Sequence, residues 1–226
     1  MTKSRIRWLL IYLLIITIIL FLLFYRPAYY KPQLVANNKQ LSTYLTHQLI
    51  PQFYNGVQLQ EPFDLVITQQ GINEIANHLP LPAESRRVDL TSPTVYFVAD
   101  RIVIAAAASV HGARLIITLE VVPAFDDKGL LSVNMDKVKI GAMNVTIPAR
   151  IIGRKMYADH FDPDKIDPND VQMLLAASFF DGRPFDPIFT IDGKRIRLTA
   201  ISITPGQLTL RFTPVSNTSA ETTLKY

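Results

Sequence analysis

An uninterrupted apolar run near the amino terminus constrains this chain more than any other feature. From Trp8 to Tyr25 there is no charge, no glycine and no proline. A helix of this length spans about 27 Å at ~1.5 Å per residue, which nearly matches the hydrocarbon core of a bilayer. No polar face interrupts the run, and this disfavours the alternative of a buried core helix. The run therefore predicts a transmembrane helix over residues 8–25.

The residues after the run indicate that this helix is not removed from the protein. A cleavable signal peptide has a shorter apolar region that is followed by small residues, whereas here bulky Phe24 and Tyr25 lead directly into Arg26. We therefore expect an uncleaved signal anchor. Residue types that favour the membrane interface flank it, and they are Trp8, Tyr25, Arg26, Tyr29 and Tyr30.

Charge alone does not orient the anchor, because three cations precede it and three more follow before residue 40. A short basic tail followed at once by an apolar run is typical of a secretory signal, and this favours a cytoplasmic tail of residues 1–7. The predicted organisation continues with a linker over 26–37 and an extracytoplasmic domain over 38–226. We expect a single-pass membrane protein whose domain lies on the periplasmic or cell-surface side, with the lipid bilayer as a partner.

Composition excludes several classes of function for the domain. Six of the 23 cations precede residue 40, and the remaining 17 face 19 anions, so residues 40–226 carry a formal net charge of −2. A nucleic-acid partner requires a basic face and is not expected. The chain contains no cysteine, which excludes disulfides, thiolate zinc sites and cysteine nucleophiles.

Apolar periodicity predicts an α+β domain. Helical spacing indicates one helix over about residues 38–53 and a second that ends near Leu79 and has the Thr68 hydroxyl placed as its N-cap. From residue 93 onward the apolar period changes to two, which predicts the body of a mainly antiparallel sheet. Further helices are expected near Pro148 and Asp167, so that two to four helices pack on the sheet.

The segment from Arg101 to Val110 is the most informative of the predicted strands. Its even-numbered and odd-numbered positions are both apolar or small, so we expect something to pack on each face of the strand. The consecutive alanines from Ala105 to Ala108 have short side chains, which allow a helix or an acyl chain to approach the backbone closely. A helix through these alanines is the alternative, because alanine favours one.

Two changes of phase in the apolar pattern predict β-bulges. The apolar positions shift near Asp136 and Lys137, and they shift again between Ala200 and Ile201. An extra residue at such a point bends a strand, and two bulges in long strands predict a curved sheet. The expected fold class is α+β, with an N-terminal transmembrane helix followed by a curved, mainly antiparallel β-sheet packed on two to four helices.

Motifs for catalysis or metal binding are not found in the sequence. The one dense cluster of hard ligands consists of His160, Asp162, Asp164, Asp167 and Asp170. A calcium loop needs a glycine-permitted sharp turn and a bidentate carboxylate at a defined distance, and neither is present. An acidic turn before a helix is the simpler interpretation. No catalytic residue, metal ligand or cofactor is predicted, and an enzyme is the least favoured hypothesis.

The order of these features resembles a group of envelope proteins. The anchor precedes a helix introduced by Val66-Ile-Thr-Gln-Gln-Gly-Ile-Asn-Glu-Ile75, a hairpin of residues 114–123 and 130–141, the segment Asn144-Val-Thr-Ile-Pro148, and closing strands over 196–203 and 207–212. This pattern is similar to the bacterial YpmS-like envelope proteins and to related small lipid-binding families of the tubular, TULIP-like kind. The resemblance implies a curved sheet that wraps a long helix and leaves an apolar groove for lipid chains.

The resemblance also implies that strand 101–110 and helix 68–79 help to line the groove. The residues expected there are Ile72, Ile75, Leu79, Ile104, Ala106, Ala108 and Ile117. The first functional hypothesis is a membrane-anchored, non-enzymatic module that binds a lipid or lipid-like envelope component. The alternative is an envelope scaffold that docks a protein partner and whose apolar positions form a fully filled core.

Overall fold

The computed structural model describes residues 3–28, 30, 41–78, 89–110, 112–160, 167 and 170–215. These residues form an α+β fold with two antiparallel sheets. The helical segments are α1 (Lys3–Leu23), the π-helical turn η1 (Leu45–Leu49), α2 (Ile50–Leu59), α3 (Gln69–His78), α4 (Thr146–His160) and α5 (Val171–Asp181). The strands are β1 (Phe63–Thr68), β2 (Asp89–Val98), β3 (Arg101–Val110), β4 (Ala113–Phe125), β5 (Leu131–Ile140), β6 (Met143–Asn144), β7 (Ile188–Ile191), β8 (Lys194–Thr204) and β9 (Gln207–Pro214).

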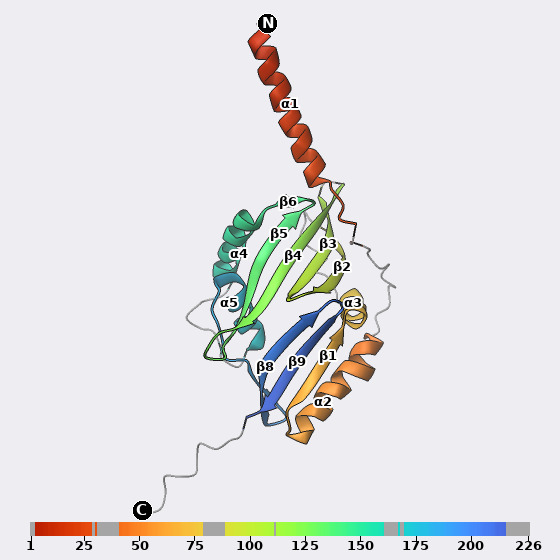
Figure 1. The fold of residues 1–226 in the computed structure, drawn as a ribbon, viewed down its shortest axis with the longest axis vertical. Helices are drawn as coiled ribbons and strands as arrows, with labels where there is room; N and C mark the ends of the chain where they lie inside the picture. Colours follow the sequence, from red (N-terminus) through yellow and green to blue (C-terminus); the bar gives the residue numbers. More distant parts are fainter. Residues whose placement is uncertain are drawn as a thin grey trace, which may run out of the picture.

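The helix α1 leaves the domain as a free-standing helix (Figure 1). Its segment Ile6–Leu23 is long and apolar enough to cross a membrane, and none of that segment is buried in the domain. A core helix would be buried, so this alternative is wrong. The hydroxyl of Thr17, a polar group inside this apolar segment, donates to the Leu13 carbonyl oxygen at 2.9 Å and is thus paired within the helix.

The first helix of the domain differs from its prediction at both ends. Helical backbone begins at Thr43, and α2 continues to Leu59 instead of ending near residue 53. Gly56 lies buried inside this helix, because the ring of Phe63 packs where a Cβ atom would otherwise stand. A glycine that would ordinarily weaken a helix is used here for close approach of a neighbouring strand.

The helix expected after Thr68 is confirmed, and the strand β1 precedes it. Leu65 and Ile67 of β1 are buried at alternate positions. The helix α3 begins at Gln69, and the Oγ1 atom of Thr68 accepts a hydrogen bond from the Gly71 amide at 3.1 Å. This is the role of an N-cap hydroxyl.

The strands form two antiparallel sheets where the sequence predicted one. The four-stranded sheet has the order β1-β9-β8-β7, and the five-stranded sheet has the order β2-β3-β4-β5-β6. The strand β3 covers Arg101–Val110 without interruption, so the helical alternative for Ala105 to Ala108 is wrong. Period-two alternation marks a strand but not its partners, which is why the division into two sheets was not predicted.

Both predicted bulges are confirmed. The register between β4 and β5 slips at Asp136, and the register between β8 and β9 slips at Thr199. One extra residue moves every following side chain to the other side of the strand. This is the change of phase that the sequence displays.

The two sheets meet beside the turn between β8 and β9. The Gly206 amide donates to the Phe97 carbonyl oxygen at 3.0 Å, and the Asp100 amide donates to the Ile203 carbonyl oxygen at 3.1 Å. A hydrophobic cluster with members from both sheets lies here, and its buried residues are Val57, Leu65, Ile67, Phe97, Leu131, Phe185, Ile196, Leu198, Ile203, Leu208 and Phe212. Both sheets therefore share this main core cluster.

The two later helices begin near their predicted positions. The helix α4 starts at Thr146 and α5 starts at Val171. The Asp170 carboxylate accepts hydrogen bonds from the amides of Gln172 and Met173 at 2.9 and 3.1 Å. This aspartate is thus the cap of a helix N-terminus, where a negative charge is favourable.

Candidate functional site on the five-stranded sheet

One side of the five-stranded sheet is apolar along its two central strands. Antiparallel pairing sets Ile104 opposite Leu119 and Ala106 opposite Ile117, so these side chains leave the sheet on the same side. We call this side the apolar face. On β3 and β4 it consists of Ile102, Ile104, Ala106, Ala108, Leu115, Ile117, Leu119 and Val121.

The apolar face is only partly covered. Ala108 is 1% exposed and forms part of its floor. Ile104, Ala106 and Ile117, the other predicted groove residues on these strands, retain intermediate exposure. A sheet face inside a close-packed core would bury all of them, so part of the face is open to solvent.

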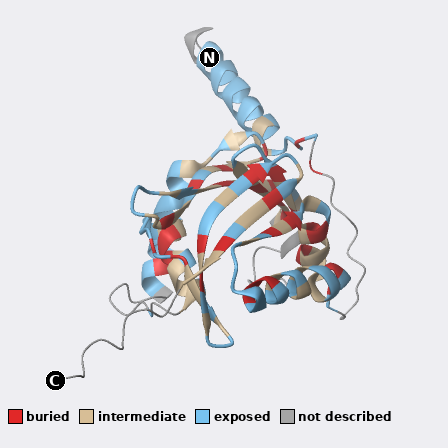
Figure 2. Ribbon diagram, turned by 60° about the horizontal axis from the view of Figure 1, so that its bottom comes forward, coloured by how far each residue is buried: buried red, intermediate tan, exposed pale blue. Residues whose placement is uncertain are grey.

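Helices flank the apolar face on both sides. The helix α3 packs against β2 at one edge of the sheet, and α4 and α5 pack against β5 near the other. Figure 2 shows the strands between these two groups of helices. The strand β8 contacts β2 and β4 and closes one end of the face. The other end lies toward α1 (Figure 1).

The helix expected to line the groove, α3, lies at the border of the apolar face. Ile72 packs against the main core cluster, and Ile75 is partly buried. Leu79 lies outside the described residues. The structure thus brings together the strand residues of the predicted groove, while Ile72 is shared with the core.

Asn73 fixes α3 against the edge of the sheet. Its Oδ1 atom accepts from the Val95 amide at 2.6 Å, and its Nδ2 atom donates to the Val95 carbonyl oxygen at 2.8 Å. Gln69 acts similarly further along β2, accepting from the Phe97 amide at 3.0 Å. Both side chains thus make hydrogen bonds to the backbone of β2 that a neighbouring strand would otherwise make. Their role was not predicted, although a polar residue on the buried side of an amphipathic helix is a signal for it.

The opposite side of β3 is filled by the chain itself. Ala105 and Ala107 are 0% and 1% exposed, and Tyr30 packs on them together with Ile116. Burial raises the pKa of the Tyr30 hydroxyl, although the nearby Arg114 guanidinium opposes that rise. The small side chains therefore admit a tyrosine ring where a helix or an acyl chain was expected.

The residues predicted for the membrane interface divide into two groups. Trp8 and Tyr25 are 59% and 46% exposed, and Arg26 is exposed as well. Tyr30 differs from the expectation, because its ring is 2% exposed and lies against the sheet. The guanidinium carbon of Arg26 is 5.8 Å from the centre of that ring, a cation–π distance. Tyr29 lies outside the described residues.

The end of α1 is hydrogen-bonded to the sheet. The Ala142 amide donates to the Leu22 carbonyl oxygen at 2.8 Å. The neighbouring Gly141 amide donates to the Ile116 carbonyl oxygen at 2.7 Å. Gly141 has a φ of +60°, and a Cβ atom there would overlap the carbonyl oxygens of Leu22 and Leu23, so only glycine fits. The turn between β5 and β6 is thereby held at the base of α1.

A buried carboxylate lies on the filled side of the sheet. Glu120 is 8% exposed and pairs with Arg101 and Lys139, each at 3.1 Å. Burial is the largest single influence and raises the pKa of Glu120. The hydrogen bonds and charges of Lys139 and Arg101 outweigh it, so this pKa lies below its usual value. Glu120 is therefore ionised, and its ion pairs connect the neighbouring strands β3, β4 and β5.

Acid is expected to destabilise the domain through Glu120 and Glu74. The pKa of Glu74 is lowered first by the Tyr44 amide and then by the Ser42 hydroxyl, which donate to its carboxylate at 2.9 and 2.8 Å. Both folded-state pKa values lie below those of the unfolded chain. Their contribution to the free energy of unfolding is therefore complete at a pH above the ordinary pKa of glutamate. It is lost as the pH falls through the two folded-state pKa values. Urea unfolding of the full chain in detergent micelles at decreasing pH measures this loss.

The variant Glu120→Gln is expected to flatten that pH dependence. It leaves two cations without their carboxylate and costs about 1–3 kcal/mol at neutral pH. The matched control is Glu61→Gln, because Glu61 is exposed and its substitution should change stability by less than about 0.5 kcal/mol. A pH profile of Glu120→Gln as steep as that of the unmodified protein would contradict the assignment.

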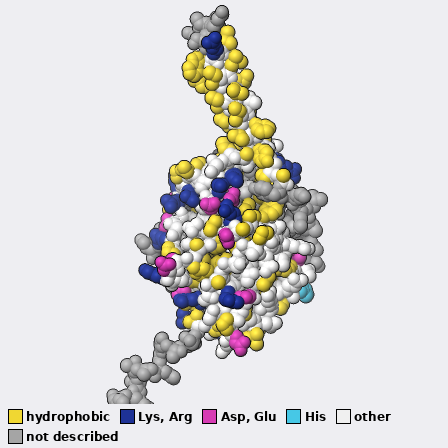
Figure 3. Space-filling view, viewed as in Figure 1, with side chains coloured by type: hydrophobic (Ala, Val, Ile, Leu, Met, Phe, Trp, Pro, Cys, Tyr) yellow, Lys and Arg dark blue, Asp and Glu magenta, His cyan; other side chains and the backbone are white. Residues whose placement is uncertain are grey.

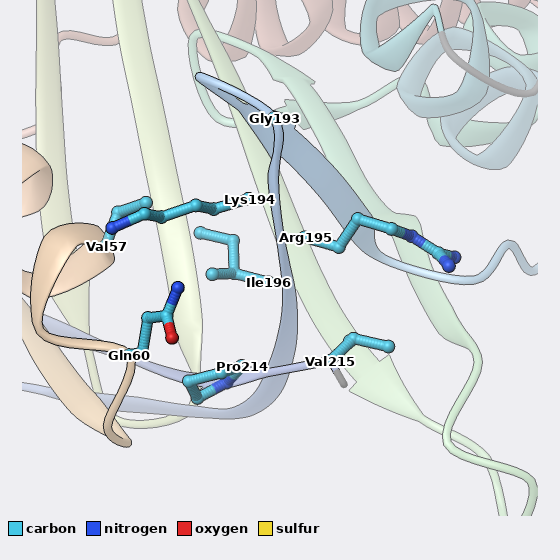
Figure 4. A pocket seen from close by; sticks show the side chains of 8 residues that line it. All are labelled: Val57, Gln60, Gly193, Lys194, Arg195, Ile196, Pro214 and Val215. Atoms are coloured by element: carbon cyan, nitrogen blue, oxygen red, sulfur yellow. The ribbon is translucent and has the colours of Figure 1, made fainter. Parts of the chain in front are cut away.

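A pocket of about 390 Å³ lies at the end of the domain away from α1. It is lined by Val57, Gln60, Gly193, Lys194, Arg195, Ile196, Pro214 and Val215. Figure 4 shows Lys194 lying toward α2, while Arg195 points away from the group. The Nζ atom of Lys194 donates to the carbonyl and side-chain oxygens of Gln58 at 3.1 and 2.7 Å. This mixed polar lining does not fit an acyl ligand, and we assign the pocket no function.

The described part of the chain contains no group of three histidine or carboxylate side chains that could hold a metal ion. Asp170 of the acidic cluster is a helix cap, as the simpler interpretation expects. Asp162 and Asp164 lie outside the described residues. Asp64 forms an ion pair with Arg211 at 2.8 Å and thus has a structural partner.

Comparison with known proteins gives no relative from which a function could be transferred. No family model matches the chain, and searches of curated proteins and of solved structures find no match. The apolar face and the helix α1 are therefore the features that bear on the function.

Proposed function

We propose that the protein is a membrane-anchored, non-enzymatic module whose apolar face holds the acyl chain of a lipid or of a lipid-like envelope component. The observation that carries the proposal is the partial exposure of Ile104, Ala106 and Ile117 on a uniformly apolar side of the sheet. Exposed patches of this kind mark binding sites for apolar ligands. The helix α1 is long and apolar enough to span a bilayer, which would keep lipid within reach.

The free energy of such binding would come mainly from covering apolar protein surface. An acyl chain that leaves a bilayer is already shielded from water, so its own methylene groups contribute little net free energy. The apolar face gains about 25 cal/mol for each Å² that is removed from water. A covered area of about 200 Å² then corresponds to about 5 kcal/mol, before the cost of ordering the chain is subtracted.

The side of the membrane belongs to the same proposal. The basic tail of residues 1–7 favours a cytoplasmic amino terminus, and the domain of residues 38–226 then lies in the cell envelope. Retention of the anchor is supported by the hydrogen bond between Ala142 and Leu22. A domain that bonds to the last turn of its own membrane helix would lose that contact if the helix were cleaved away.

The resemblance to YpmS-like envelope proteins and TULIP-like families supports a lipid-binding role. Proteins of these families are expected to hold lipid chains between a curved sheet and a helix, and in this chain α3 would be that helix. The helix α3 has 10 residues, so the proposed groove is short. The curvature of the sheet around α3 is part of this proposal.

An envelope scaffold that docks a protein partner is the second candidate. Tyr30 favours it, because this residue fills the opposite side of β3 from within the chain. The small residues of the strand can therefore serve packing alone. In that case the apolar face would meet a protein surface instead of an acyl chain.

Photo-crosslinking separates the two candidates. The full chain is reconstituted in vesicles of phosphatidylethanolamine and phosphatidylglycerol that contain a phospholipid with a diazirine at the end of one acyl chain. After irradiation, the adducts are mapped by mass spectrometry, and adducts on α1 are the internal control for anchoring. Adducts on peptides that carry Ile104, Ala106 or Ile117 support the proposal. Adducts confined to α1 contradict it.

The variant Ala106→Trp is expected to remove the adducts on β3 and β4. An indole at the centre of the apolar face occupies the space that an acyl chain needs, and a loss of ~1.4 kcal/mol lowers the affinity about tenfold. Ala200→Trp is the matched control, because Ala200 is an exposed strand residue of β8. Wild-type adducts in Ala106→Trp would rule out the apolar face as the binding site.

A further inference from the structure

The helix α4 turns an apolar side outward. Four of its large side chains, which we call the α4 patch, are 58–75% exposed: Ile147, Ile151, Ile152 and Met156. Residues four positions apart share one side of a helix. The other side packs on the domain, where the Tyr157 ring stacks on Phe180 at 5.9 Å between ring centres. Single exposed apolar residues are common, but a row of four marks a surface that something covers.

The α4 patch is held beside the end of α1. Ile147 is only five positions after Ala142, whose amide is bonded to the Leu22 carbonyl oxygen. Five extended steps along the chain span at most about 18 Å. The first turn of α4 is fixed further by Thr146, whose Oγ1 atom accepts from the Val138 amide at 2.9 Å. Figure 1 shows α4 near the end of the domain from which α1 departs.

The charges of α4 suit a bilayer surface. Three cations, Arg150, Arg154 and Lys155, stand against the single anion Asp159 in this helix. Arg150 and Arg154 each also donate a hydrogen bond to a carbonyl oxygen of the domain, at Met135 and Phe180. Helices that lie in a membrane interface combine an apolar side with lysine and arginine that meet anionic head groups. In Figure 3, hydrophobic side chains lie next to Lys and Arg side chains on the part of the domain nearest to α1.

We infer that α4 lies in the head-group region of the bilayer that α1 spans, with the α4 patch among the lipid chains and the cations against anionic phospholipid. The inference rests on the anchoring part of the proposed function and is independent of a lipid on the apolar face. It fixes the domain to the bilayer at two points, α1 and α4. The end of the apolar face that lies toward α1 then stays against the membrane surface.

Spin labelling at single cysteines tests this inference, because the chain has no cysteine of its own. The full chain with Ile151→Cys is labelled with a nitroxide and reconstituted in vesicles of phosphatidylcholine and phosphatidylglycerol. Power saturation then compares collisions with oxygen, which concentrates in the bilayer, and with a water-soluble nickel complex. Phe24→Cys, just after α1, is the membrane control. Leu59→Cys, at a side chain that is 70% exposed, is the aqueous control.

The inference predicts high oxygen and low nickel accessibility at position 151, close to the values at position 24. Omission of phosphatidylglycerol should weaken this protection. Values at 151 that equal those at 59 overturn the inference but leave the anchoring intact, whereas aqueous values at 24 contradict the anchoring itself. Dipolar broadening at 151 that disappears on dilution with unlabelled chain means that a second copy covers the α4 patch, and this also overturns the inference.

Discussion

Replacing Tyr30 with alanine is expected to lower the free energy of unfolding by about 3–5 kcal/mol, the range for truncation of a fully buried aromatic side chain. Tyr30 is 2% exposed and packs on Ala105 and Ala107. Alanine side chains cannot move into the space that the ring leaves, so the cavity persists. We therefore expect the cost to lie toward the upper end of that range.

Urea unfolding of the full chain in detergent micelles, followed by circular dichroism, measures the effect of Tyr30→Ala. Tyr25→Ala is the matched control, because Tyr25 lies just before the connector and is 46% exposed, and its change should stay within about 0.5 kcal/mol. Tyr30→Phe keeps the ring and should cost about 1 kcal/mol through loss of the hydroxyl. Superposition of the Tyr30→Ala curve on that of the unmodified protein would show that the connector does not dock on the sheet.

Docking of Tyr30 changes what the linker does. A linker over residues 26–37 reaches at most about 40 Å when it is fully extended. In the structure, Tyr30 packs on the sheet and Ala142 bonds to the last turn of α1. The sheet is therefore held at the base of the helix at two points, and the reach of the domain is shorter than the linker length implies.

Local patterns in the sequence predicted the strands and their irregularities. The two-sided strand from Arg101 to Val110 and the bulges at Asp136 and Thr199 are properties of adjacent residues. Side chains alternate along any strand, so a strand and a slip in its phase are visible without knowledge of its partner. These features were therefore accessible before the structure.

Contacts between segments that are far apart in the sequence could not be predicted from local patterns. The alanines from Ala105 to Ala108 signalled a close approach, but their sequence does not say that Tyr30 makes it. The helix predicted to end near residue 53 continues through Gly56, which accommodates the ring of Phe63 inside α2. In each case the deciding partner lies far along the chain or in another element, and tertiary packing overrides the local preference.

The strand half of the candidate site follows from local register, whereas the position of its helical half does not. Ile104, Ala106 and Ile117 share the apolar face because a tight hairpin fixes the register of β3 and β4. The contribution of α3 depends on how that helix docks, and docking is decided by the side chain of Asn73 at the edge of β2. A helical period shows which side of α3 is apolar but not which strand it meets.

Replacing Asn73 with leucine is expected to cost about 2–6 kcal/mol in the free energy of unfolding. The side chain is 6% exposed and exchanges two hydrogen bonds with Val95, while its Nδ2 atom also donates to the Gln69 carbonyl oxygen at 2.8 Å. Leucine has a similar volume but leaves the Val95 amide and carbonyl unpaired. Each buried polar group without a partner costs about 1–3 kcal/mol.

Amide hydrogen exchange on the full chain in micelles distinguishes this role of Asn73 from a general loss of stability. The Val95 amide should exchange faster in Asn73→Leu, while amides in the centre of β4 keep most of their protection. Gln70→Leu changes an exposed position of the same helix. It should leave the exchange rates of the Val95 amide and of the β4 amides unchanged. If the Val95 amide stays protected, α3 does not act as the neighbouring strand of β2. In that case α3 would not border the apolar face, and the proposed groove would have no helix on the side of β2.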